Sequence, residues 1–367
     1  MRRGLSAEID LDAAKHNLYA VRKTAKGLPV IAVVKADAYG HGAVRLARAF
    51  EDAGAAALAV AFASEARELR DAGVKAPVIV LFDRTGVEEC FDLGLTPVLH
   101  DLKTAEAFSR EAARRKRTLD VHVKVDTGMG RMGLGDLEEA RAIAGLEGLR
   151  VTGLMSHFSE ADLSDMDYAR AQLAAFLSVR DELRKRGLSP ICHMANSAAT
   201  LCFAESHLDA VRPGLALYGY APSPGLDAPL RPVMKVSARV VALRRLGKGR
   251  PVSYERTFIT RRPTLAAVLG VGYADGYGRL FSNNASVLIR GRRAPVLGRV
   301  CMDLTVVDAT DIEGVTESDE AVLLGPQGGE SVGAWELARN ALSIPYEILL
   351  SLGKNASRAY LPAGSGQ

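Results

Sequence analysis

The first two thirds of the chain alternate short apolar runs with segments of helical periodicity. Eight runs have the length and composition of buried strands: residues 30–34, 57–62, 78–82, 96–99, 119–125, 151–155, 191–194 and 210–212. Helical spacing covers residues 41–53, 63–72, 102–117 and 168–186, and Asp136-x-x-Glu139 is typical of a capping box that begins a further helix. Eight strand–helix repeats predict an α/β fold, a (β/α)8 barrel of TIM type. A doubly wound sheet is the competing architecture, because periodicity alone does not separate the two.

The pattern changes after Pro222–Gly225, a proline-rich tetrapeptide. Short β-branched runs separated by glycine, proline and arginine follow at residues 233–243, 264–271, 285–289 and 300–307, and they predict a mainly antiparallel β domain. Residues 334–352 have helical character that Pro345 interrupts. We therefore expect a barrel domain at residues 1–228 and a C-terminal β domain at residues 229–367. About the first ten residues are candidates for packing with the second domain.

Composition and charge narrow the class of protein. Of 367 residues, 48% are hydrophobic and 25% charged, which supplies a large core and argues against disorder. The formal charge is only +4 and basic runs are short, as at residues 114–117, so we expect no nucleic-acid partner. No uncharged apolar stretch of about 18 residues occurs, and no apolar segment follows Arg2 and Arg3, so we expect neither a membrane helix nor a signal peptide. Four cysteines without a C-x-x-C pair favour free thiols in a reducing cytoplasm.

A lysine directly follows the first apolar run, in the sequence Val33-Val34-Lys35-Ala36-Asp37-Ala38-Tyr39-Gly40-His41-Gly42. A buried ammonium group is costly, and at the carboxyl end of a barrel strand it would point into the region where such barrels carry out chemistry. Desolvation there would lower the pKa of the amine and make it a nucleophile toward an aldehyde. Taken alone, Lys35 favours the simpler interpretation of a strand-end lysine that reaches water.

This segment resembles the lysine motif of the alanine racemase family, and the resemblance extends from Ala7–Asp10 to Tyr360. Eight further motifs occur in the family's order and spacing: Val123–Gly133, Ser156–Phe158, Ala195–Ala199, Val211–Gly214, Val252–Tyr254, Gly272–Tyr277, Cys301–Asp303 and Pro345–Glu347. The resemblance implies an isomerase of fold type III that depends on pyridoxal 5′-phosphate (PLP), with Lys35 holding PLP as a Schiff base. It implies the interconversion of L-alanine and D-alanine, which supplies D-alanine for the peptidoglycan of the cell wall. It also implies a homodimer in which the β domain of one subunit completes the active site of the other.

The same resemblance assigns two catalytic bases. Lys35 would serve the D-enantiomer and Tyr254 the L-enantiomer, as inversion needs bases on opposite faces of the α-carbon. A tyrosine ordinarily titrates near pH 10, so nearby positive charge is needed for it to act as a base. His157, between Tyr254 and Arg212, would relay that charge. Arg212 would face the pyridine nitrogen and disfavour its protonation, which limits side reactions such as transamination.

The remaining roles come from the same matches. The expected PLP-binding residues are Lys35, Tyr39, Arg131, His157, Asn196, Ser197, Arg212, Gly214, Leu215 and Tyr346. Hydroxyl and N–H groups would hold the phosphate, as no lysine or arginine stands among its expected ligands. Arg131 and the Met302 backbone N–H would bind the substrate carboxylate, and Tyr273 would narrow the entrance channel. Lys124 is a candidate for carbamylation, since a carbamate could orient Arg131. We expect no metal ion at this site.

The residues alone leave simpler alternatives at three positions. Ser197 fits a helix N-cap, Arg212 a salt-bridged structural arginine and His157 a satisfied core histidine. At one position the chain departs from the family: Glu255 follows Tyr254 where glycine is usual. A carboxylate there would either raise the pKa of the tyrosine or face solvent.

Three rival functions remain. A PLP barrel decarboxylase for basic amino acids would need a catalytic cysteine and acidic substrate-binding residues that are not evident in the sequence. A broad-specificity racemase is typically exported and disulfide-bonded. A non-catalytic PLP carrier would resemble the barrel alone, whereas this chain adds a β domain with Tyr254.

Overall fold

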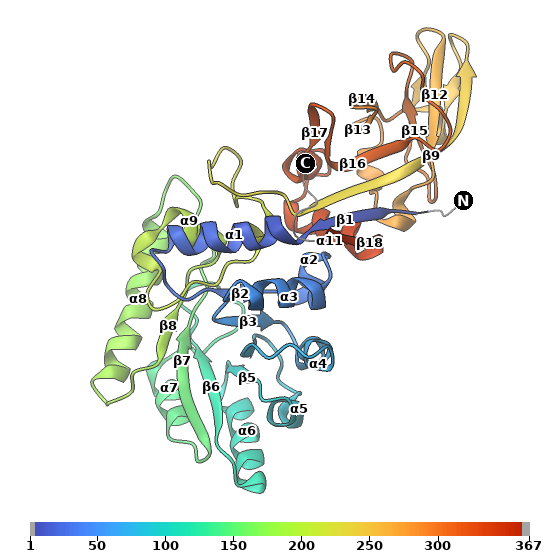
Figure 1. Ribbon diagram of the computed structural model, residues 1–367. Coiled ribbons are helices and arrows are strands. Elements are labelled where there is room, and N and C mark those ends of the chain that lie inside the picture. The colour runs from blue at the N-terminus through green and yellow to red at the C-terminus, as the bar shows by residue number, and fades with distance from the viewer. Residues whose placement is uncertain (1–3, 362–367) are drawn as a thin grey trace. The chain divides into compact units, whose positions relative to one another are not determined.

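The structure, a computed structural model, describes residues 4–361; Met1–Arg3, on which the leader prediction partly rests, and residues 362–367 lie outside it (Figure 1). The described chain divides into two compact units. One, the barrel unit, contains residues 13–38 and 43–231. The other, the β unit, contains the chain up to Asp12, Tyr39–Gly42 and the chain from Pro232 onward.

The barrel unit is built on seven parallel strands that pair in sequence order. They are β2 (Ile31–Val33), β3 (Ala57–Val60), β4 (Val78–Val80), β5 (Thr96–Leu99), β6 (Leu119–Lys124), β7 (Leu149–Met155) and β8 (Ile191–His193). Two isolated parallel bridges, His193 with Ala210 and Val211 with Val30, link β8 back to the start of the first strand. The predicted eighth strand is therefore present only as Ala210–Val211. An unbroken sequential order without a switch point confirms the barrel and excludes the doubly wound sheet.

Helices connect the strands and cover their outer side (Figure 1). They are α1 (Leu11–Thr24), α3 (Ala43–Asp52), α4 (Ala63–Asp71), α5 (Val87–Asp92), α6 (Leu102–Arg115), α7 (Leu137–Ala144), α8 (Asp167–Arg184) and α9 (Ser197–Cys202). The predicted helices are confirmed to within a few residues. Helix α5 was not predicted, because six residues are too few to show the hydrophobic period of a helix. At α7 only half of the predicted capping box forms. Asp136 accepts from the Glu139 amide at 2.9 Å, but the Glu139 carboxylate accepts from Gly135.

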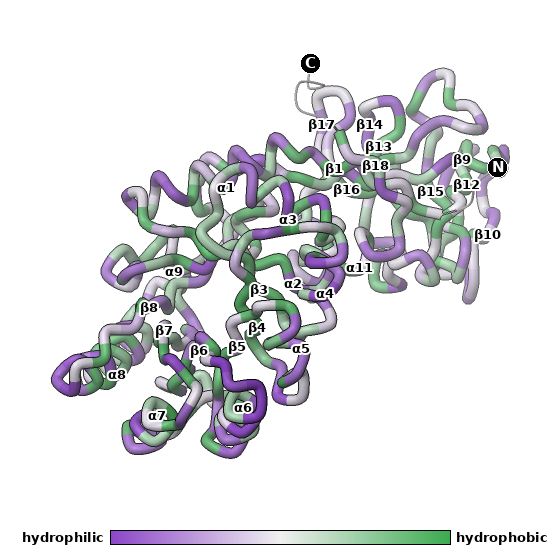
Figure 2. Tube along the Cα trace, turned by 60° about the horizontal axis from the view of Figure 1, so that its bottom comes forward, coloured by the Kyte–Doolittle hydropathy of each residue, from purple (hydrophilic) through white to green (hydrophobic). Residues whose placement is uncertain are grey.

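The core of the barrel unit lies along its strands. All residues of β2, β3 and β4 are buried, and in Figure 2 the hydrophobic colour follows β3 and β4 while the hydrophilic colour follows α6. This is the distribution expected of a parallel sheet covered by amphipathic helices. Among residues 4–361, no helix combines the length and apolar character needed to cross a membrane.

The β unit confirms the prediction of a mainly antiparallel second domain. Its main sheet has the order β14-β13-β16-β9-β1-β18, with β12 on β9, β15 on β12, and β17 on β16. The bounds are β1 (Ser6–Asp10), β9 (Met234–Leu246), β12 (Thr264–Leu269), β13 (Ser286–Ile289), β14 (Arg292–Pro295), β15 (Thr305–Asp308), β16 (Glu320–Gln327), β17 (Glu330–Val332) and β18 (Ser357–Leu361); β10 (Pro251–Val252) and β11 (Phe258–Ile259) form a separate hairpin. Only β1 and β18 pair in parallel. β1 also pairs with β9, so the N-terminal strand is part of this sheet.

Two details of the β unit differ from the sequence prediction. The predicted strand at 300–307 is wrong for residues 300–304, because the Cys301 amide donates to the Leu304 carbonyl at 2.9 Å in a turn that carries Met302. The predicted helix at 334–352 is divided into α10 (Ala334–Asn340) and α11 (Pro345–Asn355). Pro345 stands in the first turn of α11, where its missing N–H costs nothing.

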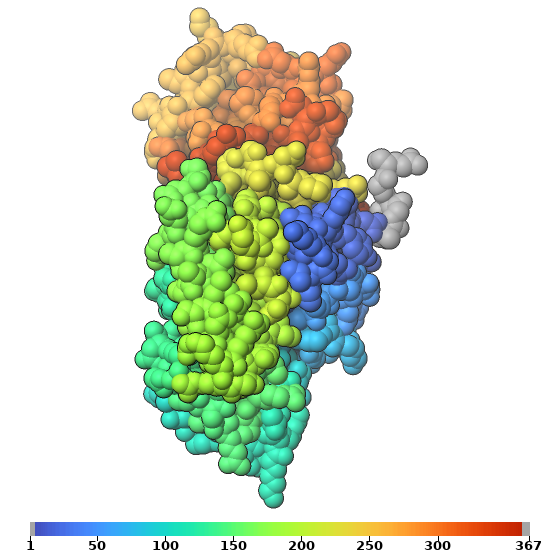
Figure 3. Space-filling view, turned by 90° about the vertical axis from the view of Figure 1, so that its left-hand side faces the viewer, coloured from blue at the N-terminus to red at the C-terminus, as the bar shows by residue number. Residues whose placement is uncertain are grey.

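Helix α1 is fastened to the end of the barrel unit by Asn17. The buried side chain donates to the carbonyls of Leu217 at 3.2 Å and Arg231 at 2.8 Å, and it accepts from the Arg231 amide at 2.7 Å. His16 adds a bond to the Pro229 carbonyl at 2.8 Å. In Figure 3 the blue N-terminal residues accordingly lie beside yellow residues that come about 200 positions later in the chain. One amide thus satisfies three backbone groups of a segment distant in sequence.

We predict that Asn17→Ala lowers the free energy of unfolding by about 1–3 kcal/mol, because it leaves buried backbone groups without partners. Equilibrium denaturation in urea measures the loss. The control is Asn355→Ala, whose exposed side chain donates only to the Ser351 carbonyl and should change stability by less than about 0.5 kcal/mol. Equal effects of the two substitutions would show that Asn17 does not have this fastening role.

Candidate active site

Lys35 is followed by a left-handed turn. In α2 (Lys35–Tyr39), the four residues after the lysine have φ between 51° and 55°. Each costs an L-residue about 1–2 kcal/mol, so the turn persists only because its surroundings hold it. The Glu65 carboxylate accepts from the Ala36 amide at 2.7 Å, and the Asp37 carboxylate accepts from the Ala43 amide at 2.7 Å. The strained backbone therefore begins directly after the candidate nucleophile, Lys35.

Glu65 is a site residue that the sequence analysis missed. Its second carboxylate oxygen accepts from the Ala61 amide at 2.6 Å, so it joins the end of β3 to the turn after β2. A glutamate in the first turn of a helix is ordinarily a capping residue, and nothing local shows that this one reaches another loop.

Lys35 is half-buried, and two guanidinium groups, those of Arg131 and Arg212, act on its charge. Burial lowers its pKa, the guanidinium groups of Arg131 and Arg212 lower it further, and Glu65 opposes them. Its Nζ lies 5.1 Å from the centre of the Phe82 ring, and the Arg131 guanidinium lies 5.5 Å from the same ring. The structure thus brings Lys35 and Arg131 to one aromatic side chain. A lysine in these surroundings holds more of the neutral amine, the form that attacks an aldehyde.

Lys124 ends β6 with only 1% of its surface exposed. Its Nζ donates to the Met132 carbonyl. Burial lowers the pKa of Lys124 to about 8, with Asp126 opposing and Arg131 contributing. A buried amine with this pKa is partly neutral near pH 8, which carbamylation by carbon dioxide requires.

Asp126 organises the loop between Lys124 and Arg131. One carboxylate oxygen accepts from the amides of Gly128 and Met129 at 2.8 Å and Gly130 at 3.2 Å, and the other accepts from the Arg131 amide at 3.2 Å. These bonds lower the pKa of the carboxyl group against the opposing effect of burial. The loop therefore holds Arg131 above the end of β6. An aspartate two residues before a glycine, as in Asp126-Thr127-Gly128, is typical of a side chain that accepts from loop amides, but the sequence analysis gave Asp126 no role.

Arg212 is the centre of the polar network inside the barrel. Only 3% exposed, it donates to Nδ1 of His193 at 2.6 Å, to Nδ1 of His157 at 3.1 Å and to the Ser156 carbonyl at 2.9 Å. His193 in turn bonds Nδ1 of His122 through Nε2 at 2.9 Å. A guanidinium group only donates, so each Nδ1 facing it accepts and each neutral imidazole carries its proton on Nε2.

Burial is also the main reason that these histidines stay neutral. Burial first and Arg212 second lower the pKa of His157 and His193 well below the usual range and that of His122 to about 4. His157 is consequently a neutral Nε2–H donor. The structure brings Arg212 and His157 together, and it adds His193 and His122, which the sequence analysis missed because a strand histidine carries no mark of its partner.

A group of backbone amides converges on Ser197. Its buried Oγ accepts from the amides of Gly214 at 3.0 Å and Ala216 at 3.1 Å. Ser197 is not the N-cap of α9; that position belongs to Asn196, whose side chain accepts from the Ala199 amide at 3.0 Å. A hydroxyl and amides without a lysine or arginine form a small neutral cradle.

The β unit gathers a second group of candidate residues. Tyr254 is 66% exposed and follows Ser253, whose φ is 62°. The Tyr273 amide donates to the Cys301 carbonyl at 3.0 Å, which joins the turn of Tyr273 to that of Met302. Gly272 makes this approach possible, because a Cβ there would collide with the Cys301 carbonyl. Tyr39 and Tyr346 also meet in this unit, with ring centres 5.8 Å apart.

Comparisons with known proteins cover both units. The family model described as the alanine racemase N-terminal domain matches residues 9–222, and that of the alanine racemase C-terminal domain matches residues 233–360. The chain is 47% identical over 367 residues to the alanine racemase of Thermodesulfovibrio yellowstonii, covering 98% of this chain and 99% of that protein. It is 40% identical to the alanine racemase of Carboxydothermus hydrogenoformans, covering 97% and 99%.

Solved structures of alanine racemases are also similar to this chain in fold. The crystal structure of alanine racemase from Streptomyces lavendulae is similar with a TM-score of 0.93 at 37% identity, covering 99% of this chain and 98% of that one. Alanine racemase from Bartonella henselae with covalently bound pyridoxal phosphate is similar with a TM-score of 0.88 at 32% identity, covering 98% and 100%.

Proposed function

The chain belongs to the alanine racemase family, and from that premise we propose how its own residues carry out the reaction. It is a PLP-dependent isomerase that interconverts L-alanine and D-alanine. The match of residues 233–360 to the C-terminal domain excludes the PLP carrier, which would have the barrel alone. The observation that carries the assignment of roles is Lys35, half-buried at a strand end and flanked by two arginines that lower its pKa.

Most of the residues that would hold the cofactor belong to the barrel unit. The Lys35 amine would bind PLP covalently, Arg131 would bond its phenolic oxygen and Arg212 would face the pyridine nitrogen. The phosphate would be held by Ser197 and the amides of Gly214 and Leu215, with Tyr39, Tyr346 and Asn196 completing the set. The geometry at Ser197 supports this assignment, because its hydroxyl and the amides of Gly214 and Ala216 come together there without a cation among them. When bound, PLP supplies the stabilisation of negative charge on the substrate α-carbon.

Arg212 would act through its fixed charge. A guanidinium group cannot accept a hydrogen bond, so beside the pyridine nitrogen it would disfavour protonation there. Its bonds to His157 and His193 hold it in one orientation. The ring would then be a weaker electron acceptor, which favours return of the proton to the α-carbon over transamination.

Two residues would move the proton. Lys35 would take it from or return it to the D-face, and Tyr254 would serve the L-face. His157, neutral and donating from Nε2, would stabilise the phenolate of Tyr254 with charge supplied by Arg212. Arg131 and the Met302 amide would fix the substrate carboxylate, and Tyr273 would stand at the entrance channel. Each well-placed acid or base contributes about 10²–10⁴-fold to the rate.

We further propose a homodimer whose β unit completes the partner's site, with a small amino acid as substrate. The chain would act in the cytoplasm, which its free cysteines support: Cys90, Cys192, Cys202 and Cys301 all lie in the described part and none is disulfide-bonded. There its product would supply D-alanine for peptidoglycan.

The two-base assignment predicts an asymmetric defect in Tyr254→Phe. The substitution removes only a hydroxyl, so PLP binding should persist while proton removal from L-alanine slows by about 10²–10⁴-fold. In D₂O the variant should wash deuterium into D-alanine faster than it forms L-alanine, as followed by proton NMR. Racemisation of both enantiomers near the parent rate would rule Tyr254 out, and His157 would be the next base to test.

Shared active sites predict complementation between inactive variants. Lys35→Ala and Tyr254→Phe homodimers, mixed under conditions of subunit exchange, should regain activity, because one site of each heterodimer keeps both bases. Activity is followed by circular dichroism, and exchange by mass spectrometry of tagged subunits. Exchange without recovered activity would mean that each chain builds its own site.

Carbamylation of Lys124 predicts a dependence on carbon dioxide and pH. Only the neutral amine reacts, so the carbamate should be lost as pH falls below about 8, the pKa of Lys124. A carbonyl signal from ¹³C-labelled bicarbonate should be visible by NMR at pH 8.5 and absent in Lys124→Ala. That variant should lose about 10- to 150-fold in kcat/KM, equivalent to about 1.5–3 kcal/mol for hydrogen bonds to a charged group. The exposed Lys103→Ala is the control; a signal unchanged in Lys124→Ala would contradict the assignment.

A further inference from the structure

Glu255 occupies a backbone conformation that suits glycine. Its φ is 59° and its ψ is 1°, and its neighbours Ser253 and Arg256 have φ values of 62° and 54°. Glycine adopts this region freely, whereas the Cβ of any other L-residue is strained there. The chain therefore keeps a glutamate beside Tyr254 at a conformational cost, and the contacts of its side chain have to offset that cost.

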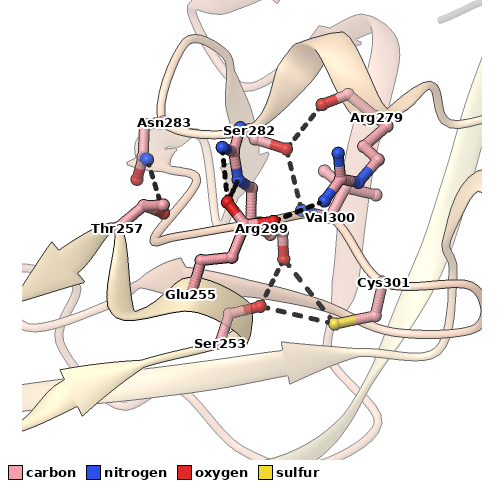
Figure 4. Close-up of polar contacts among 9 residues, drawn as sticks. All are labelled: Ser253, Glu255, Thr257, Arg279, Ser282, Asn283, Arg299, Val300 and Cys301. Atoms are coloured by element: carbon pink, nitrogen blue, oxygen red, sulfur yellow. Dashed lines mark hydrogen bonds and ion pairs between the residues drawn. The ribbon is translucent and has the colours of Figure 1, made fainter.

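Two arginines hold the Glu255 carboxylate. One oxygen accepts from Arg279 at 3.1 Å, and the other accepts from Nε and a terminal nitrogen of Arg299 at 3.2 and 2.8 Å (Figure 4). Arg299 first and Arg279 second lower the pKa of Glu255. The carboxylate thus does not stand alone in solvent, and its charge is more than balanced by two cations. Glu255 is exposed, as one of the two expected arrangements has it, but its carboxylate is paired with two arginines that the sequence did not indicate.

The two arginines belong to the loops that carry the other candidate residues of this unit. Arg299 lies three residues before Met302, and its carbonyl accepts from the Ser253 hydroxyl at 2.6 Å. Arg279 begins the short helix η5 (Arg279–Phe281), six residues after Tyr273. Ser282 joins these two segments, since its hydroxyl donates to the Arg279 carbonyl and accepts from the Val300 amide at 3.0 Å (Figure 4).

Glu255 therefore links three loops at one point. Tyr254 itself is 66% exposed, so side-chain packing does not determine where its loop lies. Exposed ion pairs add little to stability, so a large effect on folding is not expected. Holding one loop in register with two others is a separate effect, because a displacement of about 1 Å can cost about 100-fold in rate.

We propose that Glu255 is a positioning residue for the reaction: through Arg279 and Arg299 it holds Tyr254 in the orientation that proton transfer on the L-face requires. The proposal rests on the proposed role of Tyr254 as the second base. Glu255 takes no part in the chemistry and moves no proton. It replaces the conformational freedom of glycine with an anchored turn.

The test compares Glu255→Gln and Glu255→Gly with the parent holoenzyme. Because L-alanine and D-alanine have equal free energy, kcat/KM must change equally in both directions. The affected face is therefore identified by primary isotope effects with α-deuterated L-alanine and D-alanine. We expect kcat to fall by about 10- to 100-fold and the isotope effect to rise more for L-alanine than for D-alanine. Asp311→Asn, which breaks an exposed pair with Arg262 in the same unit, is the control and should leave both quantities unchanged.

A double-mutant cycle keeps the proposal falsifiable if one variant folds poorly, with folding followed by PLP content and thermal melting. If Glu255 acts through Arg299, Glu255→Gln combined with Arg299→Gln should be little worse than either single variant. Additive losses, parent-like kinetics in both Glu255 variants, or equal isotope effects on both enantiomers would each overturn the proposal.

Measurements in the Tyr254→Phe variant separate two hypotheses: that Tyr254 is the second base, and that Glu255 positions it. In that variant Glu255→Gln should have no further effect on kcat, because the group that it positions is gone. If Tyr254→Phe is itself parent-like, the assignment of the second base fails. If Tyr254→Phe behaves as expected and the Glu255 variants are parent-like, only the positioning role fails.

Discussion

The buried charge of Arg212 is the interaction on which the barrel half of the site depends. A guanidinium group that is 3% exposed is tolerated only where acceptors surround it, and two imidazoles and the carbonyls of Ser156 and His193 supply them here. Because the group can only donate, it determines the tautomer of His157 and, through His193, that of His122. One permanent charge therefore sets the hydrogen-bonding direction of three histidines and contributes to the lowered pKa of Lys35.

Three carboxylates hold the loops that carry the candidate site residues by accepting hydrogen bonds. Glu65 holds the left-handed turn after Lys35, and Asp126 holds the loop before Arg131. In the β unit, Glu255 binds two guanidinium groups beside Tyr254. In each case an acceptor fixes donors that would otherwise leave a strained or irregular loop without support. The reacting groups can then stand on loops and still be held as firmly as on regular elements.

The two units contribute different chemistry. The barrel unit gathers the amine of Lys35, the guanidinium groups of Arg131 and Arg212 and the backbone amides around Ser197. Parallel barrels present such groups on loops at or just beyond their strand ends. The β unit carries Tyr254, Tyr273 and Met302 on turns that Gly272 and the ion pairs of Glu255 bring together.

The sequence by itself determined the alternation of strands and helices, the change to antiparallel strands after residue 225 and the family, because hydrophobic periodicity and motif spacing are local properties of the chain. It did not reveal that residues 300–304 form a turn, that the eighth strand shrinks to Ala210–Val211 or that Asn196 caps α9. Nor did it show Glu65, Asp126 and His193 as parts of the site, or the two arginines on Glu255. The contacts of Glu65, His193 and the two arginines are hydrogen bonds between residues about 20 to 70 positions apart, and such partners meet only when the folded backbone brings them together.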